Sequence, residues 1–417
     1  MSTYNYYYDE SEHSRKINYE TIVASNYYDN FVSVIVGWTQ DRENTIFCKY
    51  ADFEDKYKGR KDNKGELKST TLRPKNFEYG FASLNKQNLQ FVDDFLSIFN
   101  KDIHLYFAIA SKIEYLVLQL FSDYRNGLLI NTDAMKYSIT KALVVYRPET
   151  VIKCIYETPE LFVDKLKIFF RERIENNKKN LELKQSESDA FEHILNYLES
   201  ISVIPKQHWD YHISFDGFRK YLQEKQIDDY LLTIDQEGNM TDESKTLQAA
   251  REVGLYNCKE LNSLNNYGLR IADMMAGIIS KLLKALCDSL TYRSIDEEVK
   301  KKLLHEKWFI MKESQLELYK KLYKIICVWD HAWYKSYAGI YSDDLVTFIA
   351  LLNYMNHFES VAQINAEGTT TQNEYFNSFV CELLQNRFKN STHKLSIEPI
   401  SFVNTDFSKQ KGSKNIL

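Results

Sequence analysis

Apolar and polar positions over the first 111 residues predict a small sheet and one helix. Segments 3–9 and 31–38 are rich in Tyr, Val and Ile and are bounded by polar stretches, which predicts two strands that pair with each other. The charged stretch 51–65 predicts a loop, and 65–72 predicts a third strand of the same antiparallel meander. Helical spacing of apolar residues over 85–101 precedes another strand at 102–111. The expected order is therefore β-β-β-α-β.

The next hundred residues have an almost wholly helical pattern. We interpret 112–207 as a helical insertion, in which the very polar segment 171–189 predicts a solvated helix end or a mobile linker. An α/β pattern returns at 208, with an apolar strand at 230–235, a helix near 242–254 and a short strand near 255–261. The apolar helix that begins at Gly268 follows.

From Thr291 onward the pattern is helical and free of strands, with an apolar stripe that includes Trp308, Leu316 and Tyr319. The expected fold class is α/β, a mixed sheet with a helical insertion and an all-helical C-terminal extension. The expected division is an α/β core at 1–111 and 208–290, the insertion at 112–207, and a helical C-terminal region at 291–417.

Composition narrows the class of protein. The 417 residues are 44% hydrophobic, yet no apolar run approaches the roughly 20 residues of a bilayer span, and the first residues lack the apolar stretch of a signal peptide. Six scattered cysteines without CxxC pairing argue against a disulfide framework and a zinc knuckle. We therefore expect a cytoplasmic protein with no membrane partner. A net charge of -5 is unlike a protein that coats DNA, so any nucleic-acid contact must be local.

Three acidic residues occupy positions where burial of a carboxylate is costly. Asp9 ends one apolar strand, with Glu10 beside it, Asp235 ends another, and Asp273 interrupts an apolar helix. Each has an ordinary explanation when taken singly: Asp9 a turn cap, Asp235 the start of a turn, and Asp273 a helix acid favoured by the macrodipole. If they converge, their hard oxygens suit one or two Mg²⁺ or Mn²⁺ ions, the arrangement that cleaves phosphodiesters.

Two motifs resemble the domain-of-unknown-function 3800 family, an RNase H-like group. The strand NYYYDES is similar to the family's opening Tyr-x-Asp-Glu-Ser-Gly, and NNYGLRIADMMAGII is similar to its closing Gly-Leu-Gln-x-Ala-Asp-x-x-Ala-Gly. YLLTID and GELKS also resemble family segments. The resemblance spans about residues 3 to 290, discontinuously.

This resemblance implies an RNase H-like fold and a metal-dependent nuclease. It implies that Asp9, Asp235 and Asp273 are metal ligands and that Glu10 is an accessory catalytic acid. Further accessory candidates are Glu66, Lys68 and Ser11. Bacterial enzymes of this type often act in defence, so the resemblance also implies an anti-phage role.

The sequence departs from the family pattern at three places. Glu12 stands where the family usually has glycine, Arg270 replaces the usual glutamine, and the strand at 102–111 ends in Ser111 rather than in an acid. Small residues Ala272, Ala276 and Gly277 predict close approach of the last helix to the sheet, which simple packing also explains.

Two functions follow from these residues. The first is a nuclease acting on DNA or RNA through Mg²⁺ or Mn²⁺. The alternative, favoured by the missing glycine and the acid-free strand, is a non-catalytic RNase H-like module that binds nucleic acid, or a protein partner through its helical regions. Convergence of the carboxylates separates the two, because carboxylates more than about 8 Å apart cannot share a metal ion at ordinary ligand distances.

Overall fold

The computed structural model describes residues 3–11, 19–24, 27–126, 131–201, 212–236 and 243–393. Its centre is a six-stranded mixed sheet in the order β6-β5-β1-β2-β4-β7. Strand β2 runs antiparallel to β1 and β4, whereas β1 pairs in parallel with β5, β5 with β6, and β4 with β7. The strands are β1 (Tyr4–Ser11), β2 (Asn30–Thr39), β4 (His104–Ser111), β5 (Tyr230–Asp235), β6 (Cys258–Leu261) and β7 (Ser336–Ala338). The fold is therefore mixed α/β, as expected.

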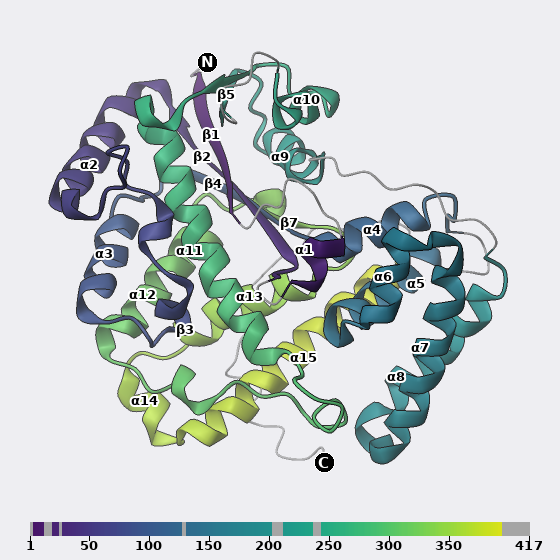
Figure 1. Ribbon diagram of the computed structural model, residues 1–417. Helices are drawn as coiled ribbons and strands as arrows, with labels where there is room; N and C mark the ends of the chain where they lie inside the picture. Colours follow the sequence, from purple (N-terminus) through teal and green to yellow (C-terminus); the bar gives the residue numbers. More distant parts are fainter. Residues whose placement is uncertain are drawn as a thin grey trace.

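One face of the sheet is covered by a long helix that crosses β1 and β2 diagonally (Figure 1). This helix, α11 (Tyr267–Leu290), is buried on nearly every side as far as Leu286, and most of its buried residues are apolar, which is the pattern of a helix in a core. More helices pack around it and share its apolar core: α2 (Glu43–Lys56), α3 (Lys86–Leu96), α12 (Glu313–Tyr323), α13 (Asp343–Asn356) and α15 (Thr369–His393). The short strand β3 (Glu78–Phe81) lies beside α11, outside the six-stranded sheet.

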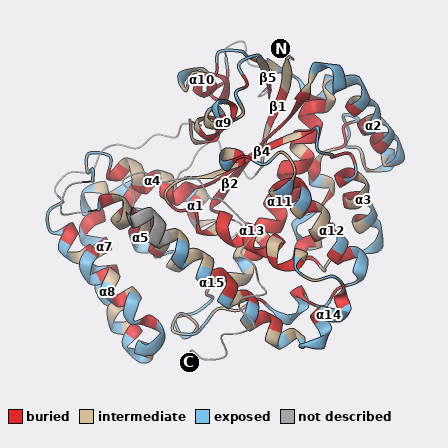
Figure 2. Ribbon diagram, turned by 180° about the vertical axis from the view of Figure 1, so that it is seen from behind, coloured by how far each residue is buried: buried red, intermediate tan, exposed pale blue. Residues whose placement is uncertain are grey.

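The opposite face carries a smaller core under α9 (His212–Lys225) and α10 (Lys245–Glu252). Side chains of β1 alternate between the two cores, because successive residues of a strand point to opposite faces. Tyr6 and Tyr8 lie in the core under α9, whereas Tyr7 lies in the core under α11. Figure 2 shows the strands and α11 as largely buried.

The predicted insertion forms a helical unit with its own apolar core. Its helices are α4 (Lys112–Leu120), α5 (Thr132–Tyr146), α6 (Glu149–Glu157), α7 (Phe162–Asn177) and α8 (Leu181–Leu198), and α1 (Tyr19–Val23) packs against α6. The segment 171–189, predicted to be a solvated helix end or a mobile linker, contains the end of α7 and the start of α8, with Lys178 and Lys179 exposed between them, and it is not a linker. Asn177 is fully buried, accepts a hydrogen bond from Arg173 at 3.2 Å and donates to Glu187 at 3.0 Å, so the polar side chains hold α7 and α8 together as a hairpin.

Three further expectations need correction. The region after Thr291 is mostly helical and includes α14 (Val361–Ala366), but β7 extends the central sheet, so this region is not free of strands. Segment 65–72 is not a third strand: it is an extended coil that ends in a 3-10 turn at Ser69–Thr71, and β4 takes the place beside β2. The charged stretch predicted to be a loop is in part helix, since α2 continues to Lys56. Among the described residues, no helix has both the length and the apolar content to cross a membrane.

Candidate functional site

Asp9 and Asp235 lie side by side at the carboxyl ends of two parallel strands. The register pairs Tyr8 of β1 with Ile234 of β5, and the next residue of each strand is an aspartate. Tyr8 and Ile234 face the core under α9, so alternation places both aspartates on the face covered by α11. Neighbouring strands lie about 4.8 Å apart, which brings the two carboxylates within electrostatic range.

Asp273 reaches the same face from α11 and is held by a turn that is distant in sequence. The backbone N–H of Ser69 donates to Oδ2 of Asp273 at 2.8 Å, and the Ser69 hydroxyl donates to Oδ1 at 2.8 Å. Both carboxylate oxygens are therefore fixed in orientation. Sequence reasoning missed Ser69, although it lies immediately after the Glu-x-Lys segment.

Two glycines allow this close packing. A Cβ on Gly268 would lie 2.4 Å from the ring of Tyr7, so this glycine lets the start of α11 approach β1. A Cβ on Gly277 would lie 2.2 Å from the Cβ of Ser69. The expectation that Gly277 allows the helix to approach the sheet is therefore corrected, because the segment that it admits is the 69–71 turn. Ala272 and Ala276 are buried in the core under α11.

The three aspartates share one electrostatic environment. Burial raises the pKa of Asp9 well above its ordinary value, and the negative charges of Asp273, Glu10 and Asp235 raise it further. Burial also raises the pKa of Asp235 and that of Asp273, against the hydrogen bonds donated by Ser263 and Ser69 respectively. The structure thus brings together the three residues predicted from sequence as ligands.

Glu66 and Lys68 lie at the same cluster. Lys68 forms an ion pair with the buried Glu66 at 3.1 Å. Burial lowers the pKa of the Lys68 ammonium, but Glu66 and the charges of Asp273 and Asp235 outweigh burial and raise it. Lys68 is therefore a positive charge placed among the carboxylates.

The remaining candidates on β1 are divided between the two faces. Ser11 follows the alternation of Tyr7 and Asp9 and lies on the α11 face, paired in register with Val32. Glu10 lies on the opposite face, where its charge raises the pKa of the buried Tyr8. Glu10 still acts on Asp9 through its charge, but it does not share the face of the three aspartates. Glu12 lies outside the described residues.

Arg270, the departure from glutamine, has a structural partner. Its guanidinium donates to both carboxylate oxygens of Glu54, at 2.7 and 2.9 Å, and lies over the ring of Tyr267. Both partners of this ion pair are buried, and Lys61 adds a second cation to Glu54 at 3.0 Å. Arg270 thus fixes α2 against the start of α11.

Strand β4 ends in Ser111 rather than in an acid, but an acid, Glu114, follows three residues later in α4. Ser111 caps α4 by accepting a hydrogen bond from the backbone of Glu114, and the Glu114 carboxylate is buried. Its Oε1 accepts from the backbone N–H of Tyr341, while its Oε2 and Oδ2 of Asp29 have no hydrogen-bond partner among the residues that the structure describes. This second group of acids was not predicted from the sequence. Glu114 lies within a helical pattern, and no feature of that pattern indicates that its side chain is buried.

The spacing of the aspartates bears on metal binding. Among the described residues, no group of three or more His, Cys, Asp or Glu side chains has the arrangement of a metal site. Carboxylate oxygens are nevertheless the ligands that Mg²⁺ and Mn²⁺ prefer, and each carboxylate can accept several bonds at once. The donor chemistry fits a divalent cation, and side-chain movement would be required to reach ligand distances.

The fold and the site define a class of protein, a mixed α/β protein with a half-buried cluster of three aspartates at the carboxyl ends of β1 and β5. No family model matches the chain, and comparison with curated proteins and with solved structures returned no similar protein.

Proposed function

We propose that this protein is a divalent-metal-dependent nuclease of RNase H-like type that cleaves DNA or RNA. The observation that carries the proposal is the convergence of Asp9, Asp235 and Asp273 on one face at the end of β1 and β5, where the charges of the other two raise the pKa of Asp9. Carboxylates that repel one another within a buried site are stabilised by a bound cation. Hydrogen bonds from Ser69 and Ser263 give Asp273 and Asp235 structural roles, but these roles do not explain why all three charges lie on one face.

The strand arrangement supports the RNase H-like part of the proposal. Strands β4, β2, β1, β5 and β6 lie side by side in that order, with β2 antiparallel to its neighbours and β1 in the middle. This order places Asp9 on the middle strand of these five, next to the strand that ends in Asp235.

In this proposal Asp9, Asp235 and Asp273 hold Mg²⁺ or Mn²⁺. The bound ion would activate a water and stabilise the leaving oxygen of a phosphodiester. Ser69 keeps the Asp273 carboxylate oriented, and Lys68 supplies a fixed positive charge beside the cluster. Glu66 positions Lys68 through their ion pair.

The test is incubation of the pure protein with labelled DNAs and RNAs in Mg²⁺, Mn²⁺ or EDTA. We expect cleavage with metal and none with EDTA. Asp273→Asn should reduce the rate more than about 100-fold, because even residues that support metal ligands account for 10- to 100-fold. Asp102→Asn, which removes an exposed charge in the turn before β4, is the matched control. Full activity of the Asp273→Asn variant would refute the proposal.

Lys68 favours a second candidate function, a non-catalytic module that binds nucleic acid or a protein partner. A built-in ammonium can neutralise part of the carboxylate charge without a metal ion. Thermal unfolding separates the candidates: a metal ion that binds the folded state at about 100 times its Kd stabilises it by about 2.7 kcal/mol, whereas a purely structural cluster is insensitive to the ion.

A further inference from the structure

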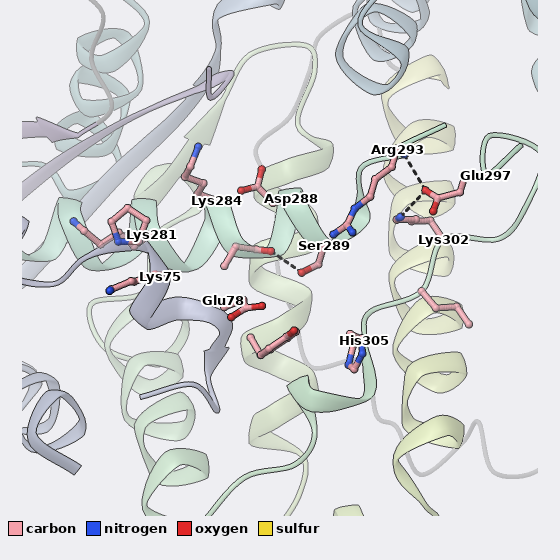
Figure 3. Close-up of a pocket in the computed structure, with 14 residues that line it drawn as sticks. Lys75, Glu78, Lys281, Lys284, Asp288, Ser289, Arg293, Glu297, Lys302 and His305 are labelled. Atoms are coloured by element: carbon pink, nitrogen blue, oxygen red, sulfur yellow. Dashed lines mark hydrogen bonds and ion pairs between the residues drawn. The ribbon is translucent and has the colours of Figure 1, made fainter. Parts of the chain in front are cut away.

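A hollow of about 610 Å³ lies along the second half of α11, beyond the acidic cluster (Figure 3). Its walls come from α11, from the segment that contains Pro74 and Tyr79, and from the chain after α11 up to His305. Five cationic side chains line it, against three acidic ones. The cations are Lys75, Lys281, Lys284, Arg293 and Lys302.

The acidic side chains of the hollow do not cancel its positive charge. Glu297 forms an ion pair with Lys302 at 3.3 Å and accepts a hydrogen bond from the backbone N–H of Arg293 at 2.8 Å. Without Lys281, which is engaged within α11, this leaves Glu78 and Asp288 against three cations, Lys75, Lys284 and Arg293. The hollow therefore has a local excess of positive charge within a chain whose net charge is -5.

The hollow and the acidic cluster share one stripe of α11. Asp273, Gly277, Lys281, Lys284 and Asp288 follow one another at intervals of three or four residues, so they lie on one side of the helix. The segment that packs against this stripe starts at Ser69, which holds Asp273, and continues past Lys75. The acidic cluster and the hollow therefore both lie between α11 and the segment that runs from Ser69 past Lys75.

Lys281 lies between the two ends. Its ammonium donates to the carbonyl oxygen of Gly277 at 3.3 Å, and Gly277 abuts Ser69. Its charge also lowers the pKa of Asp273, against the effect of burial. Positive charge thus begins next to the acidic cluster and continues into the hollow.

We propose that this hollow is a binding subsite for the phosphate backbone of a nucleic-acid strand whose cleavage site lies at Asp273. The proposal rests on the proposed function and specifies where its substrate runs. Lys284 follows Asp273 by eleven residues, about 16 Å along the helix axis, or roughly five steps of a duplex strand at 3.4 Å each. Lysine and arginine bind phosphate oxygens without reading sequence, so the subsite positions a strand and does not select its bases.

Binding is measured in EDTA, so that cleavage does not enter the result. The probes are labelled single strands and duplexes of DNA and RNA, about 20 nucleotides long, titrated at several salt concentrations. Lys75→Ala/Arg293→Ala removes two exposed cations of the hollow. We expect about tenfold weaker binding and a salt slope smaller by about 1.5 to 2, as loss of two phosphate contacts predicts.

Lys153→Ala/Arg171→Ala, in α6 and α7 of the insertion, is the matched control, since it removes the same charge from exposed positions elsewhere. Binding by the hollow variant equal to that of the wild type, or equal loss in the control, would overturn the subsite. The subsite is also overturned if inorganic phosphate binds in the hollow while the hollow variant binds strands as well as the wild type does. That result would assign the hollow to a small anion. If the hollow variant loses strand binding and the wild type never cleaves, the subsite is supported and the nuclease is refuted. The two failures are therefore distinguishable.

Discussion

The backbone N–H and the hydroxyl group of Ser69 donate hydrogen bonds to the two carboxylate oxygens of Asp273, 204 positions further along the chain. This pair of bonds joins the 69–71 turn to α11 on the face where Asp9 and Asp235 lie. The turn carries Lys68 at its start, so the same contact also sets the distance between the ammonium and the carboxylates. The geometry of the cluster therefore depends on a segment outside the sheet.

Replacement of Ser69 by alanine should weaken this contact while leaving the turn in place. The variant loses the hydroxyl donor but keeps the backbone donor, and a hydrogen bond to a buried charged group contributes about 2 kcal/mol. We expect a loss of that size in urea unfolding, together with a higher pKa of Asp273. Ser200→Ala, which removes an exposed hydroxyl that donates to the backbone carbonyl of Tyr197, is the control and should change stability little.

Gly277→Ala should also separate the turn from α11. The added Cβ would lie 2.2 Å from the Cβ and 2.6 Å from the hydroxyl oxygen of Ser69, so the turn must shift. Overpacking of this kind costs about 1–3 kcal/mol, and the higher helix propensity of alanine recovers up to about 1 kcal/mol of it. Gly59→Ala meets nothing within 4 Å and serves as the control. Unchanged stability of Gly277→Ala in thermal unfolding would show that the close approach is not required.

The sequence predicted the strands and the acids better than the segments that connect them. Strands β1, β2, β4 and β5 have strong apolar runs, so their existence followed from local pattern. The coil at 65–72 alternates like a strand, but Glu66 and Lys68 turn to each other and Ser69 turns to Asp273. Only the tertiary partner, far away in sequence, decides between the two conformations.

Two further misses have the same origin. Strand β7 has three residues and no local signal, and it forms because β4 offers an open edge. The segment 171–189 of the α7–α8 hairpin was predicted to be a solvated helix end or a mobile linker. The sequence does not reveal that Arg173 donates a hydrogen bond to Asn177 in a buried site. Hydrogen bonding between buried polar side chains is invisible to a hydrophobic pattern.

Glu114 makes stability depend on pH in a direction opposite to that of most carboxylates. Burial raises its pKa to about 8 from 4.5, and the charge of Asp29 adds to this effect, against the backbone donors at Tyr341 and Ile340. The folded state then binds a proton that the unfolded state has released, between pH 4.5 and about 8. This contribution is complete below the unfolded pKa and is lost as the pH rises through the folded pKa.

Glu114→Gln should remove the loss of stability that occurs as the pH rises through the folded-state pKa of Glu114. The amide oxygen can still accept from Tyr341, and no charge develops at high pH. Relative to wild type, the variant should gain stability as the pH rises to about 9, with a difference of up to about 1.4 kcal/mol per pH unit. Urea unfolding across this range gives the measurement, with the exposed Glu160→Gln as control. Parallel pH curves of wild type and Glu114→Gln would contradict the shift.

Lys68→Ala tests whether the acidic cluster takes a divalent cation. The substitution removes the ammonium that Glu66, Asp273 and Asp235 hold in its charged form, so the carboxylates repel one another more strongly and the melting temperature in EDTA should fall. If the cluster binds Mg²⁺ or Mn²⁺, the ion replaces the lost positive charge, and the variant should gain more from added metal than the wild type does. Lys61→Ala, which removes a cation from Glu54 and not from the three aspartates, should lose stability without this recovery. A Lys68→Ala variant that divalent ions leave unchanged, alongside an equally insensitive wild type, would favour the non-catalytic module, in which Lys68 and Lys281 supply the positive charge beside the aspartates.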